Sequence, residues 1–230
     1  QNKHDSCVCR RGTGQAFPGD DALLDHTATI GDREFADALN HAYRSQVDNH
    51  DGAVADYIPE LSKADPGHFG LAIATTAGKV YAVGEGESRF TIQSVSKAFA
   101  FCLALEVAGP EVVAARVGVE PSGDPFNAIV FDPQTNRPFN PMVNAGAIAI
   151  AGILHEHLGE GAYDFMLERF SAAAHRKLGL NEAVYLSEHE TGHRNRAIGH
   201  LLLASDAIAV PPDAALDLYF HQCSIEICAL

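Results

Sequence analysis

The stretch FTIQSVSKAFAFCLALEVAG, residues 90–109, decides both the fold and the chemistry that this sequence predicts. It opens with an extended, β-like run and continues as an apolar segment of helix-forming composition. We therefore expect a strand that leads directly into a helix whose first turn holds Ser94 and Lys97. Residues three positions apart share one helix face, so the Lys97 amine can approach the Ser94 hydroxyl. The N-terminus of such a helix also offers amide donors and positive potential to a developing oxyanion.

This SxxK pair has the chemistry of a nucleophile and its base. A serine hydroxyl attacks well only when a base removes its proton, and a lysine is such a base only where burial or another cation favours its neutral form. The apolar residues that follow, from Phe99 to Leu105, predict that Lys97 is buried. Taken alone, the motif is also compatible with an N-cap serine followed by a solvated lysine. Ser96 is a second candidate nucleophile, one step outside the SxxK register.

The remaining chain predicts a hairpin and several helices. Asp32 is a plausible N-cap for a helix over residues 32–47, and two apolar runs within residues 69–86 meet at Ala77-Gly78 as a β-hairpin would. Further helices are predicted at residues 94–107, 111–117, 143–157, 162–178, 194–203 and 214–229. A two-stranded sheet is rarely stable by itself, and no further strand pattern is evident up to Leu230. We expect another chain or a missing C-terminal segment to supply the other strands.

Composition excludes several classes of function. The chain has 230 residues, 47% of them hydrophobic, and a net charge of −14, which repels phosphate backbones and anionic lipid. We therefore expect no nucleic-acid partner. The richest apolar stretch, Ala145 to Leu154, contains two glycines and falls short of the roughly 20 residues that cross a bilayer, so we expect no membrane association either. Five scattered cysteines form neither a disulfide framework nor a CxxC metal site, which favours a cytoplasmic location.

The first thirty-one residues are expected to contribute little chemistry. They are rich in Gly, Asp and His without periodicity, and they begin without Met and without the apolar run of a signal peptide. We predict a poorly ordered lead-in over residues 1–31, followed by one domain over residues 32–230.

Six stretches together resemble the serine-dependent glutaminase family. They occur in the order in which that family carries them, and SGDPFN and NAGAI are seldom met elsewhere. The stretches are YIPELSKADP (57–66), FTIQSVSKAFAFCLAL (90–105), EPSGDPFNAIV (120–130), NPMVNAGAIAIAGIL (140–154), SEHETGHRNRAIGHLL (187–202) and LDLYFHQCSIEICAL (216–230).

The resemblance implies a fold, an activity and an assembly. The fold would be α+β, of the β-lactamase and transpeptidase type, with an antiparallel sheet flanked by helices and a helical lobe. The activity would be hydrolysis of L-glutamine to L-glutamate and ammonia without any cofactor or metal. A homodimer or homotetramer is the expected assembly.

The resemblance also implies roles for seven residues. Ser94 would be the acylated nucleophile and Lys97 its base, while Tyr57 and Tyr219 would border the site, with Tyr219 relaying a proton. Three residues would hold the amino acid end of glutamine, and their chemistry agrees, because a carboxylate can pair with an ammonium and an amide can donate to a carboxylate. These residues are Asn144, Glu188 and Asn195.

One family feature is missing from the sequence. No lysine-serine-glycine strand follows the last predicted helix, although the family would take a second oxyanion amide and a third tyrosine from that region. Loss of one oxyanion donor can lower a rate by roughly a hundredfold to a thousandfold. We therefore expect the glutaminase-like domain to be incomplete at its C-terminal end. A noncatalytic or truncated glutaminase-like binding module remains an alternative.

Two other enzyme classes compete with this interpretation. Residues 189–193 spell HExxH, the zinc-peptidase motif, which needs a continuous helix to bring both histidines to one face. Thr191 and Gly192 weaken a helix there, so a solvated loop that leads into the helix at Arg194 is expected instead. The second competitor is another SxxK hydrolase that recognises β-lactams, against which SGDPFN and NAGAI argue.

Overall fold

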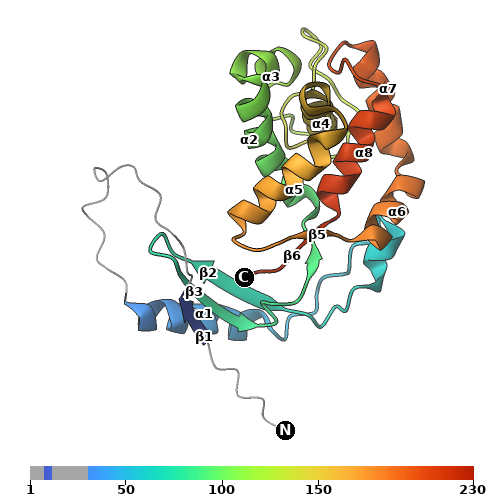
Figure 1. Ribbon diagram of the computed structural model, residues 1–230. Coiled ribbons are helices and arrows are strands. Elements are labelled where there is room, and N and C mark those ends of the chain that lie inside the picture. Colours follow the sequence, from blue (N-terminus) through green and yellow to red (C-terminus); the bar gives the residue numbers. More distant parts are fainter. Residues whose placement is uncertain (1–7, 12–30) are drawn as a thin grey trace. The chain divides into compact units, whose positions relative to one another are not determined.

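The computed structural model describes residues 8–11 and 31–230, and the chain divides into two compact units (Figure 1). The first unit comprises residues 1–55, 63–90 and 228–230, and the second comprises residues 56–62 and 91–227. All seven residues that the sequence nominates for the site belong to the second unit.

The first unit is a three-stranded antiparallel sheet covered by one helix. Its strands are β1 (Val8–Arg11), β2 (Gly70–Ala74) and β3 (Lys79–Gly84), in the order β1-β3-β2. Helix α1 (Asp32–Gln46) packs on β2 and β3. The predicted hairpin of β2 and β3 is confirmed. The third strand, β1, was not predicted and lies within the expected lead-in, because four residues are too few to show a clear periodic pattern. The rest of that lead-in, residues 1–7 and 12–30, lies outside the described residues.

The core of this unit joins one face of α1 to β3. Leu39, Tyr81 and Val83 are buried there, since alternate residues of a strand face the same side. The hairpin turns at Gly78, whose φ of +75° favours glycine. Helix α1 begins at Asp32 rather than after it, because Gly31 is the N-cap and donates its N–H to the side chain of Glu34 at 2.6 Å. The predicted N-cap was thus one residue late.

The second unit consists mainly of helices. Their bounds are α2 (Ser96–Ala108), α3 (Pro110–Arg116), α4 (Asn144–Leu158), α5 (Ala162–Ala173), α6 (Glu182–Thr191), α7 (His193–Ala204) and α8 (Pro212–Cys223). Short 3-10 turns lie at η1 (Pro59–Lys63), η2 (Gln93–Val95) and η3 (Gly159–Gly161). Three short strands, β4 (Phe90–Thr91, of which Thr91 belongs to this unit), β5 (Gly179–Leu180) and β6 (Ile225–Ile227), form a second sheet in the order β4-β6-β5.

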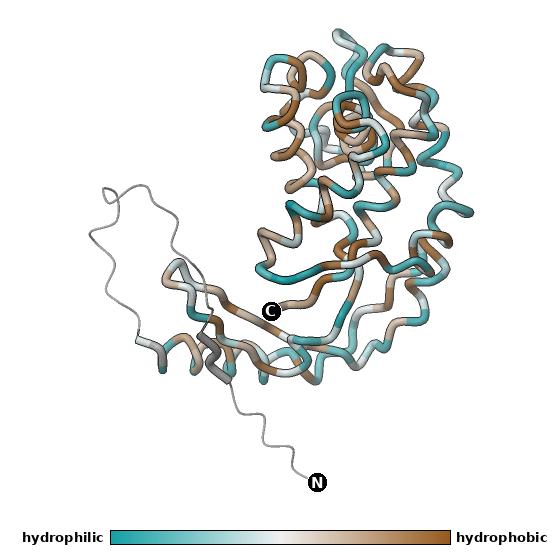
Figure 2. The backbone as a smooth tube through the Cα atoms, in the orientation of Figure 1, coloured by the Kyte–Doolittle hydropathy of each residue, from teal (hydrophilic) through white to brown (hydrophobic). Residues whose placement is uncertain are grey.

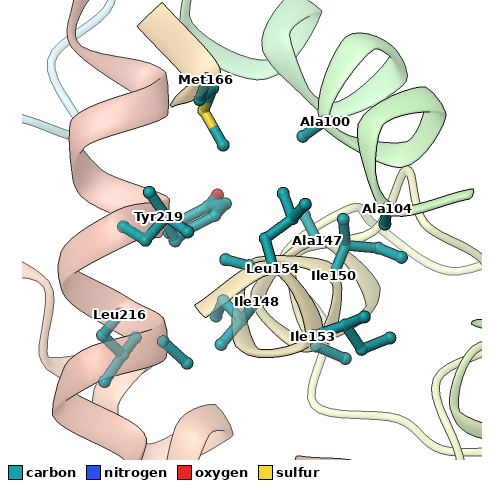
Figure 3. Packing of buried hydrophobic residues seen from close by; sticks show 14 of the residues in the cluster. Ala100, Ala104, Ala147, Ile148, Ile150, Ile153, Leu154, Met166, Leu216 and Tyr219 are labelled. Carbon is teal, nitrogen blue, oxygen red and sulfur yellow. The ribbon is translucent and has the colours of Figure 1, made fainter. Parts of the chain in front are cut away.

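Helix α4 is the centre of this unit. It packs against α2 on one side and α8 on the other, and Figure 3 shows its isoleucine and leucine side chains between Ala100 and Ala104 of α2 and Leu216 of α8. Every residue from Ala145 to Leu154 is buried, as expected for a helix that is apolar on all faces. Brown segments in Figure 2 mark the apolar residues of these helices. Each fully buried isoleucine contributes about 2 kcal/mol of hydrophobic stabilisation.

Three sequence predictions about the last hundred residues were wrong. The helix expected over residues 162–178 ends at Ala173 in α5, and strand β5 follows. The final helix was expected to continue to residue 229, but α8 ends at Cys223 and the chain then enters strand β6. The segment before residue 193 was expected to be a loop, but α6 is a helix capped by the side chain of Asn181. Strands of two or three residues give no usable periodicity, and the mixed polarity of α6 gives little helical signal.

Candidate active site

The SxxK segment folds as two successive helical turns rather than one. Ser94 lies in the 3-10 turn η2, and α2 begins two residues later at Ser96. Gln93, directly before the serine, has a φ of +48°, in the left-handed region that non-glycine residues rarely adopt. A conformation of that kind costs about 1–2 kcal/mol and is found preferentially at functional sites. The Ser94 side chain is exposed.

A cavity of about 200 Å³ lies beside Ser94. It brings together six of the seven nominated residues, which come from positions as far apart in the chain as 57 and 219. The lining consists of Tyr57, Ile58, Gln93, Ser94, Phe126, Asn127, Asn144, Glu188, Thr191, Gly192, Arg194, Asn195, Tyr219 and Cys223.

Lys97, the seventh nominated residue, is buried next to this cavity. Its Nζ donates hydrogen bonds to Oδ1 of Asn144 at 2.7 Å and to the carbonyl of Met142 at 3.1 Å. The side chain is only 2% exposed, and desolvation lowers the pKa of Lys97 below its ordinary value, although the nearby Glu188 opposes that shift. The burial comes from α4 and the segment before it. Phe99, which the sequence put forward as a cover, is 45% exposed.

A directed chain of hydrogen bonds continues from Lys97 into the cavity wall. Asn144 accepts from Lys97 through Oδ1 and donates through Nδ2 to Oδ1 of Asn195 at 3.1 Å. These three residues stand at the N-terminal ends of α2, α4 and α7. Both the oxygen and the nitrogen of the Asn144 amide therefore make hydrogen bonds, which fixes the orientation of the side chain.

Glu188 supplies a buried carboxyl group to the same cavity. It is 6% exposed, and its Oε2 has no hydrogen-bond partner among the described residues. Burial raises the pKa of Glu188 to about 8, while Lys97 draws it in the opposite direction. A buried carboxyl oxygen without a partner is costly, and a cation in the cavity would satisfy it.

The two nominated tyrosines lie at different depths. Tyr57 is 61% exposed and donates from its hydroxyl to Oε1 of Gln93 at 3.3 Å. Tyr219 is 3% exposed, and burial raises its pKa well above the ordinary value, with Cys223 and Glu188 adding to the shift. Its hydroxyl consequently stays protonated at neutral pH, and a side-chain hydrogen bond joins it to Cys223.

Ser96, the competing nucleophile, does not line the cavity. It is fully buried, donates its hydroxyl proton to the carbonyl of Gln93 at 2.6 Å and accepts from Nε2 of Gln222 at 3.3 Å. Ser94 is the serine of this segment that faces the cavity.

The family model described as Glutaminase matches residues 52–230. This chain belongs to the glutaminase family. It is 54% identical over 178 residues to Glutaminase 2 of Bradyrhizobium diazoefficiens, covering 77% of this chain and 28% of that protein. A solved probable glutaminase, ybaS, matches with a TM-score of 0.82 and 32% identity over 86% of this chain and 65% of that one. Mglu, solved in its tris and glutamate form, matches with a TM-score of 0.77 and 31% identity over 84% of this chain and 43% of that one.

These matches confirm the resemblance and the fold class that the sequence predicted. The α+β architecture, with small antiparallel sheets and many helices, is that of the solved glutaminases and is β-lactamase-like. The chain spans 28% of the length of the Bradyrhizobium protein, so it corresponds to a part of that relative.

The HExxH motif has no continuous helix in this glutaminase-family chain. Helix α6 ends at Thr191, Gly192 is the cap between the helices, and α7 begins at His193. A Cβ atom on Gly192 would lie 2.7 Å from the carbonyl oxygen of Glu188 and 2.7 Å from a ring carbon of Phe220. The break therefore depends on glycine, and it separates the two histidines onto different helices while placing Glu188 and Asn195 at one cavity.

Several cavity residues were not nominated from the sequence. Phe126 and Asn127 belong to the SGDPFN motif, which was noted for its rarity but not for its contacts, and Lys97 lies 5.5 Å from the centre of the Phe126 ring. Arg194 donates from Nε to the carbonyl of Asn127 at 2.7 Å. Cys223 is buried and lies four residues after Tyr219, a spacing that puts both on one face of α8. This four-residue spacing from Tyr219 was the sequence signal that could have nominated Cys223 as a cavity residue.

None of the described residues forms a helix that is long and apolar enough to cross a bilayer.

Proposed function

We propose that this chain hydrolyses the side-chain amide of L-glutamine to L-glutamate and ammonia through an ester on Ser94. The observation that carries the proposal is that an unpartnered, buried oxygen of Glu188 and the Ser94 hydroxyl line one cavity. The first group suits an amino acid's ammonium and the second suits attack on a carbonyl. A volume of about 200 Å³ fits a ligand smaller than drug-sized molecules.

In this proposal Lys97 is the base. Desolvation favours its neutral amine, which accepts the Ser94 proton as the hydroxyl oxygen attacks the side-chain carbonyl carbon. The tetrahedral oxyanion is stabilised by backbone amides at the start of α2. Ammonia leaves with a proton returned by Lys97 or relayed by the Tyr219 hydroxyl, and water then cleaves the glutamyl ester.

The amino acid end of the substrate is assigned to three side chains. Glu188 pairs with the α-ammonium, while the amides of Asn144 and Asn195 face the α-carboxylate. Tyr57 borders the cavity beside Gln93, and we assign it a contact with the outer side of the substrate. Support for an amino acid ligand also comes from the glutamate form of Mglu.

The test measures ammonia release and covalent labelling on the 230-residue chain. A glutamine analogue with a diazoketone in place of the amide should add one label, located by mass spectrometry on Ser94. Ser94→Ala should abolish both signals, and Lys97→Met should lower both by at least about a hundredfold. The proposal fails if the alanine variant still releases ammonia or takes the label. Binding of glutamine without either signal would identify a noncatalytic binding module instead.

We further propose that the protein is a homodimer or homotetramer in a reducing, cytoplasmic compartment. Cys102 and Cys223 carry free thiols within the described part of the chain, which fits such a compartment. Sedimentation velocity would give the assembly state, and a monomer at micromolar concentration would contradict the first part of this proposal. Fractionation of the source cells would test the second part.

A further inference from the structure

The strained residue before the proposed nucleophile is held by hydrogen bonds at each polar end. Gln93 adopts a φ of +48°, and such a conformation persists only where the surroundings determine it. Its side-chain Nε2 donates to Oγ1 of Thr91 at 2.9 Å, and its Oε1 accepts from Tyr57 at 3.3 Å. Its carbonyl accepts from the hydroxyl of Ser96 at 2.6 Å. The contact with Ser96 is the shortest of these three.

Burial makes the Ser96 contact the strongest constraint on the turn. Ser96 is fully buried, whereas Tyr57 is 61% exposed, and a hydrogen bond away from water is stronger and costly to leave unmade. The backbone N–H of Ser96 also donates to the Gln93 carbonyl. Ser96 therefore fixes the orientation of the peptide that joins Gln93 to Ser94.

Gln222 of α8 sets the direction of the Ser96 hydroxyl. Its Nε2 donates to Oγ of Ser96 at 3.3 Å, and both residues are fully buried. A hydroxyl has one proton, so the Gln222 amide on its lone pair leaves that proton for an acceptor, and the Gln93 carbonyl at 2.6 Å is the stronger of two neighbours because the thiol of Cys223 is a weak acceptor.

The contribution of Gln222 to stability does not by itself explain why a glutamine stands at position 222. Its Oε1 has no partner among the described residues, and an unsatisfied buried oxygen costs about 1–3 kcal/mol. An apolar side chain of similar length would avoid that loss, which points to a role in the site.

We propose that Ser96 and Gln222 are positioning residues that hold Gln93 in its left-handed conformation and so keep the Ser94 hydroxyl at the cavity. The proposal rests on the proposed function, in which Ser94 is the nucleophile. Gln222 stands three residues after Tyr219 on α8, so the same helix anchors the nucleophile's turn and carries the buried tyrosine of the cavity.

The test compares Ser96→Ala with Ser224→Ala. Both changes remove a fully buried serine hydroxyl, but Oγ of Ser224 has no hydrogen-bond partner among the described residues, which makes it a matched control. Ser96→Ala should lower kcat and the rate of diazoketone labelling by about tenfold to a hundredfold, because small misplacements of a reacting group have effects of that size. KM should stay within about twofold of the unchanged chain. Ser224→Ala should leave all three quantities near their original values.

A further set of variants, made in a chain that carries Gln93→Gly, distinguishes loss of positioning from general destabilisation of the fold. Glycine adopts a positive φ without strain, so in a Gln93→Gly background the loss caused by Ser96→Ala should shrink by at least about threefold. The double variant Ser96→Ala, Gln222→Met should lose no more activity than Ser96→Ala alone, because the two side chains act in series.

The outcomes distinguish this proposal from the one it rests on. Equal kcat for Ser96→Ala and Ser224→Ala overturns the positioning role alone, as does a loss that is unchanged in the Gln93→Gly background. A label found on Ser96 also overturns it. An unchanged chain that neither releases ammonia nor takes the label on Ser94 overturns the proposed function, and the positioning role with it.

Discussion

The Nζ atom of Lys97 lies 2.7 Å from Oδ1 of Asn144, and both side chains are buried. A neutral amide at this distance satisfies the amine without adding a negative charge, so burial remains the largest influence on the lysine. The identity of residue 144 should thus control the protonation state of the proposed base.

Replacement of Asn144 by aspartate should move the pH dependence of catalysis. A carboxylate in contact with Lys97 favours the ammonium and raises the lysine pKa, so kcat/KM near pH 7 should fall at least about tenfold. Activity should then recover at higher pH than in the unchanged chain, which a profile from pH 6 to 10 would record. Asn144→Ala, which adds no charge, should lose activity without the upward displacement. Superimposable profiles for Asn144→Asp and the unchanged chain would contradict the assignment of Lys97 as base.

Glu188 should make the chain less stable as pH rises. Its pKa is raised to about 8 in the folded state from an ordinary value of 4.5, so between these pH values the folded chain holds one proton more than the unfolded chain. The free energy of unfolding therefore falls from about pH 4.5 to about pH 8, by at most roughly 5 kcal/mol, and then levels off. Urea unfolding of the unchanged chain and of Glu188→Gln at pH 6 and pH 9 should show the part of this loss that falls above pH 6, at most roughly 3 kcal/mol, in the former only. Parallel losses in both proteins would rule out Glu188 as the source.

The same carboxyl group should couple ligand binding to proton release. An ammonium ligand binds the ionised form of Glu188, so affinity for L-glutamate should rise as pH increases from 6 towards 8, by at most about tenfold per unit. Calorimetry in two buffers of different ionisation enthalpy would detect the released proton. With Glu188→Gln the affinity should be weak and nearly independent of pH. An equally steep dependence in that variant would place the ammonium elsewhere.

The break between α6 and α7 should not tolerate even one added methyl group. In Gly192→Ala the new Cβ would stand 2.7 Å from the carbonyl oxygen of Glu188 and from a ring carbon of Phe220, so we expect about 1–3 kcal/mol of destabilisation and a raised KM. Gly161→Ala is the matched control, because a Cβ there meets nothing within 4 Å. Its stability should change by less than about 0.5 kcal/mol. Chemical denaturation of both variants gives the comparison, and equal stabilities would show that the helices can shift apart without penalty.

The parts of the fold that follow from local pattern were predictable. Two apolar runs that meet at Ala77-Gly78 predicted the hairpin, and the apolar composition of residues 145–154 marked the buried helix α4. The spacing of Ser94 and Lys97 nominated a reactive pair, and Ser94 does line a cavity with the other nominated residues. Those predictions needed only the periods of helices and strands and the order of the motifs.

Other features depend on contacts between distant segments and could not be predicted from local pattern. One partner of Lys97 is the backbone carbonyl of Met142, which no side-chain pattern reveals. The SxxK register favoured Ser94 over Ser96, but the burial of Ser96 and its bond to Gln222, 126 positions away, had no signal in the sequence. The strand β6 is three residues long, which is too short to show a period.

Helix α8 has no free face near the site. From Ala215 to Ile225 no residue is exposed, and successive side chains serve different neighbours: Asp217 accepts from Tyr185, Tyr219 and Cys223 line the cavity, and Gln222 reaches Ser96. A substitution of Asp217, Tyr219, Gln222 or Cys223 would therefore disturb the neighbouring element that the side chain contacts or the cavity that it lines. Engineering of substrate preference should consequently begin at the rim, at exposed Arg194, and treat Asp217, Tyr219, Gln222 and Cys223 of α8 as residues that can only be changed together with their neighbours.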